Sequence, residues 1–147
     1  MARSSIQEAV NRDGPDARVV PARSAPASLL ISLRPGQWLK NFFVFAALLF
    51  GLRLFDPASL ALSSAAFVVF CALSGVVYLV NDVADREADR RHPLKSKRPI
   101  AAGDLSPTAA LTAAAAMTAV ALTAAFWLRP ALGVVSVAYL ALQTAYS

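Results

Sequence analysis

Residues 58–82 read ASLALSSAAFVVFCALSGVVYLVND, an uncharged apolar run that ends in an amide and a carboxylate. The 23 residues of this run up to Val80 carry no charge. As an α-helix they would extend about 34 Å, which is enough to cross the hydrocarbon core of a bilayer. The stretch therefore predicts a membrane-spanning helix with polar residues where it reaches water.

The composition of the whole chain supports a membrane protein. Of its 147 residues, 57% are apolar and only 16% are charged, against about 25% charged in typical soluble domains. A single cysteine and a single histidine exclude a disulfide framework and a cysteine- or histidine-rich metal site. The net charge of +5 would suggest nucleic acid in a soluble protein. Here the charges cluster between long uncharged runs, so we expect a membrane and not a nucleic acid as the partner.

Further apolar runs flank this one, and together they predict four spans, at residues 37–55, 58–80, 107–128 and 131–147. The predicted fold class is all-α, a polytopic transmembrane helical bundle. Residues 1–28 are polar and hold no apolar run, which predicts a flexible cytoplasmic tail ahead of a transmembrane portion at 29–147. The fourth run stops without flanking charge, so we expect about four spans of a longer fold.

The positions of the cations predict the orientation. Twelve of the 14 Lys and Arg residues lie in residues 1–40 and 81–104. The positive-inside rule places both segments in the cytoplasm. We therefore expect a multi-pass protein of the plasma membrane whose polar site faces the cytoplasm.

Residues 81–89 read NDVADREAD and carry the candidate chemistry. Asp82, Asp85 and Asp89 are spaced i, i+3 and i+7, so on one helix they fall within about 60° of one another, with Asn81 at the edge. Three carboxylates on one face repel unless a positive charge lies between them. Mg²⁺ suits that place because it takes oxygen ligands and binds through carboxylates plus substrate phosphates. Asp82 and Asp85 are the predicted catalytic residues, and the predicted metal ligands are Asn81, Asp82, Asp85 and Asp89.

The alternative is that these acids form a solvated helix end and pair with Arg86, Arg90 and Arg91. Acids at a helix C-terminus oppose the helix dipole, which counts against this alternative.

A cationic loop follows the acids. Residues 92–99 read HPLKSKRP, and a cationic loop beside a carboxylate–metal site suits a diphosphate. Its alternative role is anchoring to anionic lipid. In the first span Lys40 could extend its ammonium to the interface, whereas Asn41 cannot reach far and is a functional candidate. The predicted substrate-binding residues are Lys40, Asn41, Asn81, Lys95 and Arg98.

These motifs carry a resemblance to a known family. The pattern NDxxDxxxD at residues 81–89, with RPIAAG at residues 98–103, resembles the first aspartate-rich motif of the UbiA prenyltransferase superfamily and the loop after it. RPGQWLKN at residues 34–41, together with HPxKxxRP at residues 92–99, resembles the decaprenyl-phosphate phosphoribosyltransferase branch of that superfamily.

The resemblance implies a helical membrane enzyme of about nine spans with a cytoplasm-facing cavity, in which two aspartate-rich motifs bind Mg²⁺ and a diphosphate. In this branch the donor is phosphoribosyl diphosphate, the acceptor is a polyprenyl phosphate, and the product feeds arabinan precursors of the cell wall. This chain carries the first motif only. A homo-oligomer is compatible with this interpretation.

Two other functions stay open at this stage. A prenyltransferase that moves a polyprenyl group from an allylic diphosphate to an aromatic acceptor would use the same Mg²⁺–diphosphate chemistry. A non-catalytic, truncated membrane protein is the second alternative.

Overall fold

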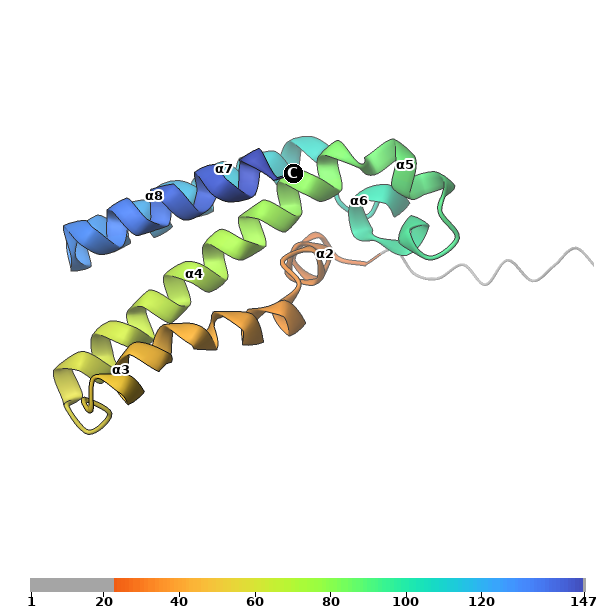
Figure 1. Cartoon of the computed structure of the whole chain (residues 1–147). Helices are drawn as coiled ribbons and strands as arrows, with labels where there is room; N and C mark the ends of the chain where they lie inside the picture. Colours follow the sequence, from red (N-terminus) through yellow and green to blue (C-terminus); the bar gives the residue numbers. More distant parts are fainter. Residues whose placement is uncertain (1–22, 147) are drawn as a thin grey trace, which may run out of the picture.

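The computed structural model describes residues 23–146, which form helices and connecting turns without a strand in that part of the chain. The all-α prediction is confirmed (Figure 1). Of the predicted tail, residues 1–22 lie outside the described residues, and residues 25–28 form the first turn of a helix instead. With η marking 3₁₀ helix, the elements are α2 (Ala25–Ser32), η1 (Pro35–Phe45), α3 (Ala46–Phe50), α4 (Pro57–Ala84), α5 (Arg86–Arg91), η2 (Lys95–Lys97), α6 (Pro99–Ala102), α7 (Pro107–Leu128) and α8 (Pro130–Ala145).

Two of the helices are long and apolar enough to cross a membrane. They are α4, with 28 residues, and α7, with 22 residues, and their most apolar 18-residue stretches have mean hydropathies of 2.3 and 1.8. They contain the spans predicted at 58–80 and 107–128. The apolar helix α8 is shorter, with 16 residues.

The segment predicted as the first span is not one α-helix. It consists mainly of η1, with 11 residues, and α3, with five. Because a 3₁₀ helix rises about 2.0 Å per residue and an α-helix about 1.5 Å, the two together reach about 30 Å. That length still suits a bilayer core, and the crossing at 37–55 remains a prediction.

Side-chain caps and prolines set the starts of the long helices. Asp56 caps α4 by accepting a hydrogen bond from the backbone N–H of Ser59 at 3.2 Å. The Ser59 hydroxyl, which donates to the same carboxylate, holds the pKa of Asp56 below its usual value. Ser106 caps α7 in the same way, accepting from the N–H of Ala109 at 3.2 Å, and Pro107 is the first helical residue. This is the helix start that the sequence predicted.

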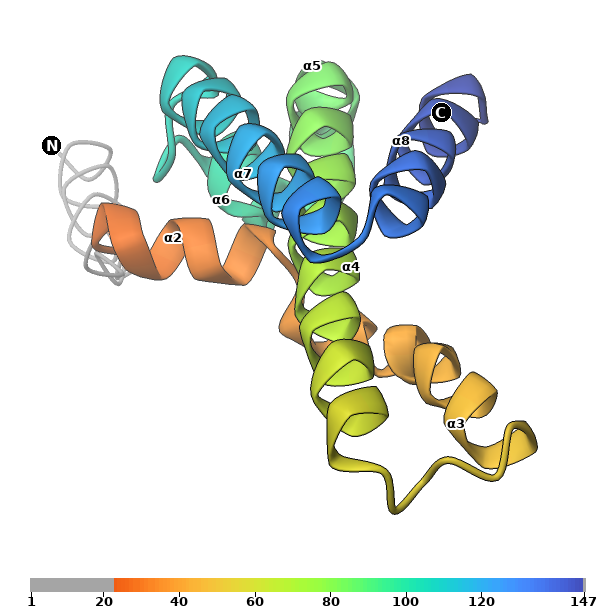
Figure 2. The same ribbon diagram turned by 90° about the vertical axis from the view of Figure 1, so that its left-hand side faces the viewer.

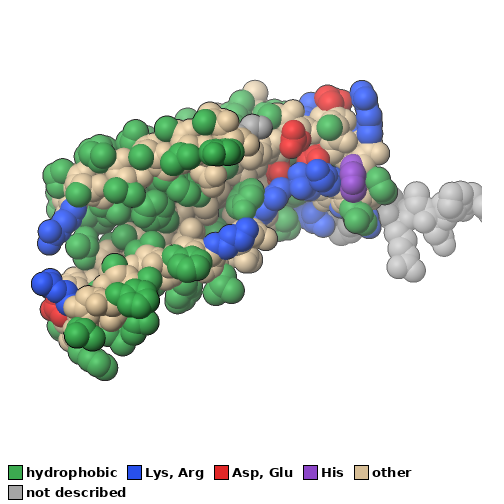
Figure 3. Space-filling view, in the orientation of Figure 1, with side chains coloured by type: hydrophobic (Ala, Val, Ile, Leu, Met, Phe, Trp, Pro, Cys, Tyr) green, Lys and Arg blue, Asp and Glu red, His purple; other side chains and the backbone are tan. Residues whose placement is uncertain are grey.

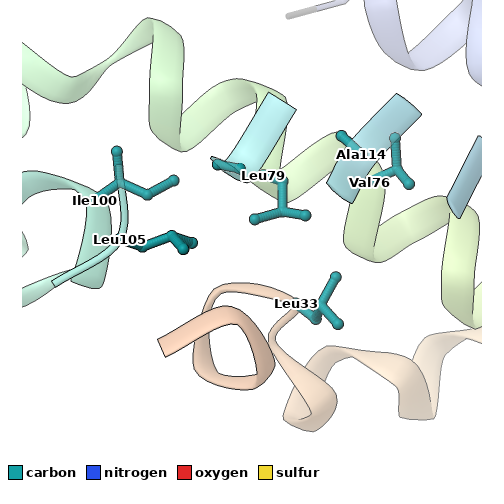
Figure 4. Close-up of a cluster of buried hydrophobic side chains, with 7 residues drawn as sticks. Leu33, Val76, Leu79, Ile100, Leu105 and Ala114 are labelled. Carbon is teal, nitrogen blue, oxygen red and sulfur yellow. The ribbon is translucent and has the colours of Figure 1, made fainter. Parts of the chain in front are cut away.

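Helix α4 is the axis of the bundle. Helices α7 and α8 and the segment η1 all pack against it, and Figure 2 shows α7 and α8 diverging on either side of it. Buried alanines of α7 allow the two long helices to approach closely. The main cluster of buried side chains lies where the end of α2, α4, α6 with the segment after it, and α7 meet. It consists of Leu33, Val76, Leu79, Ile100, Leu105, Ala110 and Ala114 (Figure 4).

Charges gather at one end of the bundle. In Figure 3 most of the acidic side chains, the histidine and many of the basic ones lie over the end formed by α5 and α6, while the body of this face carries few charged side chains and many apolar ones. Residues 81–104 and the start of η1 share this end, and the turn at 51–56 lies at the other (Figure 1). The cytoplasmic orientation of the charged end remains a prediction.

A close approach at Gly75 positions the end of α2. A Cβ atom at Gly75 would lie 2.8 Å from Cδ2 of Leu33 and 3.5 Å from its carbonyl oxygen. Gly103, with φ of 91°, ends α6 in the left-handed region that glycine adopts without strain. Gly75 therefore lets the end of α2 pack closely against α4, and Gly103 lets the chain turn after α6.

We expect Gly75→Val to lower the free energy of unfolding by about 1–3 kcal/mol, because the larger side chain pushes Leu33 away from α4. Thermal unfolding in detergent measures the effect. Gly36→Val is the control, since a Cβ at Gly36 meets nothing within 4 Å. Equal losses in the two variants would mean that the close approach at Gly75 does not constrain the fold.

Candidate functional site

Five charged side chains from separate segments meet at the charged end of the bundle. Asp82 lies in the last turn of α4 and Asp89 in α5. Lys95 lies in η2, Arg98 immediately precedes α6, and Arg34 lies between α2 and η1. We call these five residues the ion-pair cluster.

Arg98 lies between the two acids of the cluster. Its Nη1 donates to Oδ2 of Asp89 at 2.6 Å and to Oδ1 of Asp82 at 3.2 Å. Nη2 of Arg34 donates to the same Asp82 oxygen at 2.6 Å, and Nζ of Lys95 is 3.8 Å from Oδ1 of Asp89. The two carboxylates are only 2–3% exposed, so these cations supply the charge that burial of the acids requires.

The counter-charges of the two buried acids come from residues distant in the sequence. The guanidinium of Arg98, 16 residues from Asp82, contacts both Asp82 and Asp89. Arg34, 48 residues from Asp82, contacts the Asp82 carboxylate. Arg90, an expected partner in the solvated-end alternative, instead pairs with Glu87 at 3.1 Å.

Arg34 has a backbone conformation that few residues other than glycine adopt. Its φ and ψ are 51° and 63°, in the left-handed region, which costs roughly 1–2 kcal/mol for a residue with a Cβ. Its guanidinium lies 4.6 Å from the ring centroid of Tyr78. The indole N–H of Trp38 donates to the Leu33 carbonyl at 3.2 Å, which fixes the end of α2 just before Arg34. Together these contacts and the ion pair with Asp82 hold the strained backbone.

The three aspartates do not share one face. Helix α4 ends at Ala84, and Asp85, with φ of −84° and ψ of 0°, forms the joint with α5. Asp82 and Asp89 are buried, whereas Asp85 is exposed. Within residues 23–146 no three His, Cys, Asp or Glu side chains come together to hold a metal ion. The sequence analysis placed the three aspartates on one face of an unbroken helix, and the joint at Asp85 interrupts that helix.

The chemistry of the donors nevertheless fits Mg²⁺. Asn81 and the three aspartates offer only oxygen ligands on the acid side, and Mg²⁺ commonly binds through one or two carboxylates together with substrate phosphates and waters. Asp85 is the most accessible of these donors because guanidinium groups already engage Asp82 and Asp89. The assignment of the four residues as metal ligands remains a prediction.

The two candidates in the first span lie outside the cluster. The Lys40 side chain is exposed. Nδ2 of Asn41 contacts Oγ of Ser74 at 3.5 Å and Sγ of Cys71 at 3.4 Å, which places it against α4 about 12 Å from Asp82 along the helix axis. Their roles in substrate binding remain predictions.

A polar pocket of about 190 Å³ lies between α4 and α8, next to the cluster. Of its lining residues only Asn81 was singled out in the sequence, although a spacing of i, i+4 and i+7 on each helix was a signal for the other polar ones. The lining consists of Ser74, Val77, Tyr78 and Asn81 from α4, and Tyr139, Gln143 and Tyr146 from α8 and its end. By contrast, the groove of about 330 Å³ between α4 and α7 has a lining of Val, Ala and Met side chains alone, which offers a diphosphate no hydrogen bond.

Comparison with known proteins gives consistent matches. The model of the UbiA prenyltransferase family matches residues 27–147. Proteins named decaprenyl-phosphate phosphoribosyltransferase from Mycobacterium tuberculosis and Mycolicibacterium smegmatis are 45% and 40% identical to the chain over 130 residues. The protein of that name from Corynebacterium glutamicum is 40% identical over 130 residues. Each alignment covers 86% of this chain but only 43%, 41% and 39% of the respective relative, so the chain spans about two fifths of their length.

The buried ion pair should be strongly coupled. In a double-mutant cycle of Arg98→Gln and Asp89→Asn, we expect a coupling of about 1.5–3 kcal/mol, because the pair is charged and hydrogen-bonded and its carboxylate is buried. Unfolding in detergent measures the coupling. The exposed pair of Arg90 and Glu87, with Arg90→Gln and Glu87→Gln, is the control and should give about 0.2–1 kcal/mol. A buried pair coupled no more strongly than this control would contradict the role assigned to Arg98.

Proposed function

The chain belongs to the UbiA prenyltransferase family, and we propose that it supplies the donor-diphosphate site of a membrane transferase. The donor in this proposal is phosphoribosyl diphosphate, and the acceptor is a polyprenyl phosphate such as decaprenyl phosphate. The product would serve as an arabinan precursor for the cell wall. The relatives from mycobacteria and from Corynebacterium, named for this reaction, support the proposal.

The observation that carries the proposal is the ion-pair cluster at the end of an apolar bundle. Three cations, Arg34, Lys95 and Arg98, meet there beside an aspartate-rich motif. A diphosphate carries several negative charges, and Lys and Arg side chains bind its oxygens. We place this end of the bundle in the cytoplasm, where a soluble, charged donor would reach it.

The reaction requires no protein nucleophile. A phosphate oxygen of the lipid attacks C1 of the ribose, the C1–O bond to the diphosphate breaks, and the diphosphate leaves with the bonding electrons. Arg98 makes both of its contacts with acids through Nη1, so in this proposal the N–H groups of Nη2 and Nε donate to the incoming anion. Lys95 is half exposed and can turn its ammonium toward the same anion. Cations held in place before the reaction stabilise the charge that develops on the leaving group.

The acids have two roles in this mechanism. Asp82 and Asp89 orient Arg34 and Arg98 through the ion pairs described above. Asn81, Asp82, Asp85 and Asp89 are the residues that would hold Mg²⁺, with Asp85 the most accessible. When bound, Mg²⁺ supplies positive charge to the diphosphate oxygens.

The choice of donor tests the proposal directly. Membranes that contain the complete gene product should convert phosphoribosyl diphosphate and a polyprenyl phosphate to product with release of diphosphate. An allylic diphosphate with an aromatic acceptor should give no turnover. The opposite result would replace this proposal with the prenyltransferase alternative, and turnover with neither donor would favour a non-catalytic protein.

A substitution at Asp85 tests whether this acid takes part in the reaction or only stabilises the fold. We expect Asp85→Asn to reduce turnover at least 100-fold, because it removes an accessible carboxylate from the site without breaking an ion pair. The yield and thermal stability of the protein should stay unchanged. Glu87→Gln is the control, since Glu87 is an exposed acid two residues away and lies in α5. Near-normal turnover of Asp85→Asn would remove this residue from the site.

A further inference from the structure

The pocket between α4 and α8 has a regular polar lining. Ser74, Tyr78 and Asn81 lie at i, i+4 and i+7 on α4, and Tyr139, Gln143 and Tyr146 repeat that spacing on α8 and its end. Residues with this spacing share one face of a helix. Two such faces meet here, so the polar groups converge on one cavity within an otherwise apolar bundle.

The polar side chains contributed by α8 are held in place. Nε2 of Gln143 donates to the hydroxyl of Tyr139 at 3.2 Å, one helical turn away. The Tyr139 ring packs edge-on against Phe70, with 5.5 Å between the ring centroids. The amide and the phenol hydroxyl therefore have fixed positions, as expected of a site that recognises hydroxyl groups.

The size and charge of the pocket limit what it can hold. A volume of about 190 Å³ equals about six water molecules at their share of liquid volume, which suits one small ring and not a long isoprenoid chain. The lining consists of hydroxyl, amide, aromatic and valine side chains and holds no charged one. A neutral, polyhydroxylated ring matches this lining.

The pocket shares a wall with the ion-pair cluster. Tyr78 lines the pocket, and the guanidinium of Arg34 lies over its ring, 4.6 Å from the ring centroid. Asn81 lines the pocket and directly precedes Asp82 in the sequence. One molecule can therefore place a charged group at the cluster and a neutral ring in the pocket.

We propose that this pocket binds the pentose ring of the donor, and that Gln143 and Tyr139 select a sugar diphosphate over an isoprenoid diphosphate by hydrogen bonding to the ring hydroxyls. The inference rests on the proposed function and adds a subsite to it. A site whose polar groups hydrogen-bond a hydroxyl discriminates against analogues without one, because those hydrogen bonds are then lost.

The test compares the whole donor with its diphosphate alone. In the complete gene product, Gln143→Leu and Tyr139→Phe should each lower kcat/KM for phosphoribosyl diphosphate about 10- to 100-fold, mainly through KM. The inhibition constant of inorganic diphosphate should change less than twofold, because the cluster still binds it. Lys95→Ala should weaken the binding of both. Thr144→Val is the control on α8, since the Thr144 hydroxyl bonds to the Leu140 carbonyl of its own helix at 2.8 Å, and it should change neither constant.

Three outcomes would overturn the inference. An unchanged KM for the donor in both pocket variants would show that the pentose ring binds elsewhere. Equal weakening of donor and inorganic diphosphate would show that the variants act on the cluster. If the unaltered protein does not turn over phosphoribosyl diphosphate at all, the proposed function fails and this inference fails with it.

Discussion

The bridge that Arg98 makes between Asp82 and Asp89 is the contact on which the charged end of the molecule depends. Two carboxylates that are almost fully buried would repel each other and lose their hydration without compensation. A single guanidinium nitrogen contacts both, at 3.2 and 2.6 Å. Because Arg98 is fixed to α6 and Asp89 to α5, this bridge also folds the segment after α4 back onto the end of α4.

Arg34 ties the first helix of the described chain to the same point. Its ion pair with Asp82 spans 48 residues of sequence, and its left-handed backbone persists because the Asp82 carboxylate and the Tyr78 ring hold the side chain. Gly75 permits the approach, since a side chain there would meet Leu33. The packing of Leu33 at Gly75 and the ion pair of Arg34 with Asp82 thus place two consecutive residues against α4.

Our proposal assigns two recognition tasks to neighbouring surfaces. The ion-pair cluster offers charge, which suits a diphosphate, while the pocket between α4 and α8 offers neutral hydrogen-bonding groups. Tyr78 belongs to both surfaces. Rigid helices carry most of these groups, so the geometry of the site follows from the packing of α4, α7 and α8 and from the two arginines that lock its end.

Local patterns in the sequence determined the all-α fold class, the spans within α4 and α7, the start of α7 at Ser106 and Pro107, and the family resemblance. These follow from hydrophobic run length, capping chemistry and motif spacing, all of which act over a few residues. The break at Asp85 was missed because a spacing rule assumes an unbroken helix. The pairing of Arg34 with Asp82 and the facing of Gln143 and Tyr139 onto α4 came only from the tertiary structure. The reason is physical: contacts between side chains on different helices depend on how the helices pack, and no local period in the sequence encodes that packing.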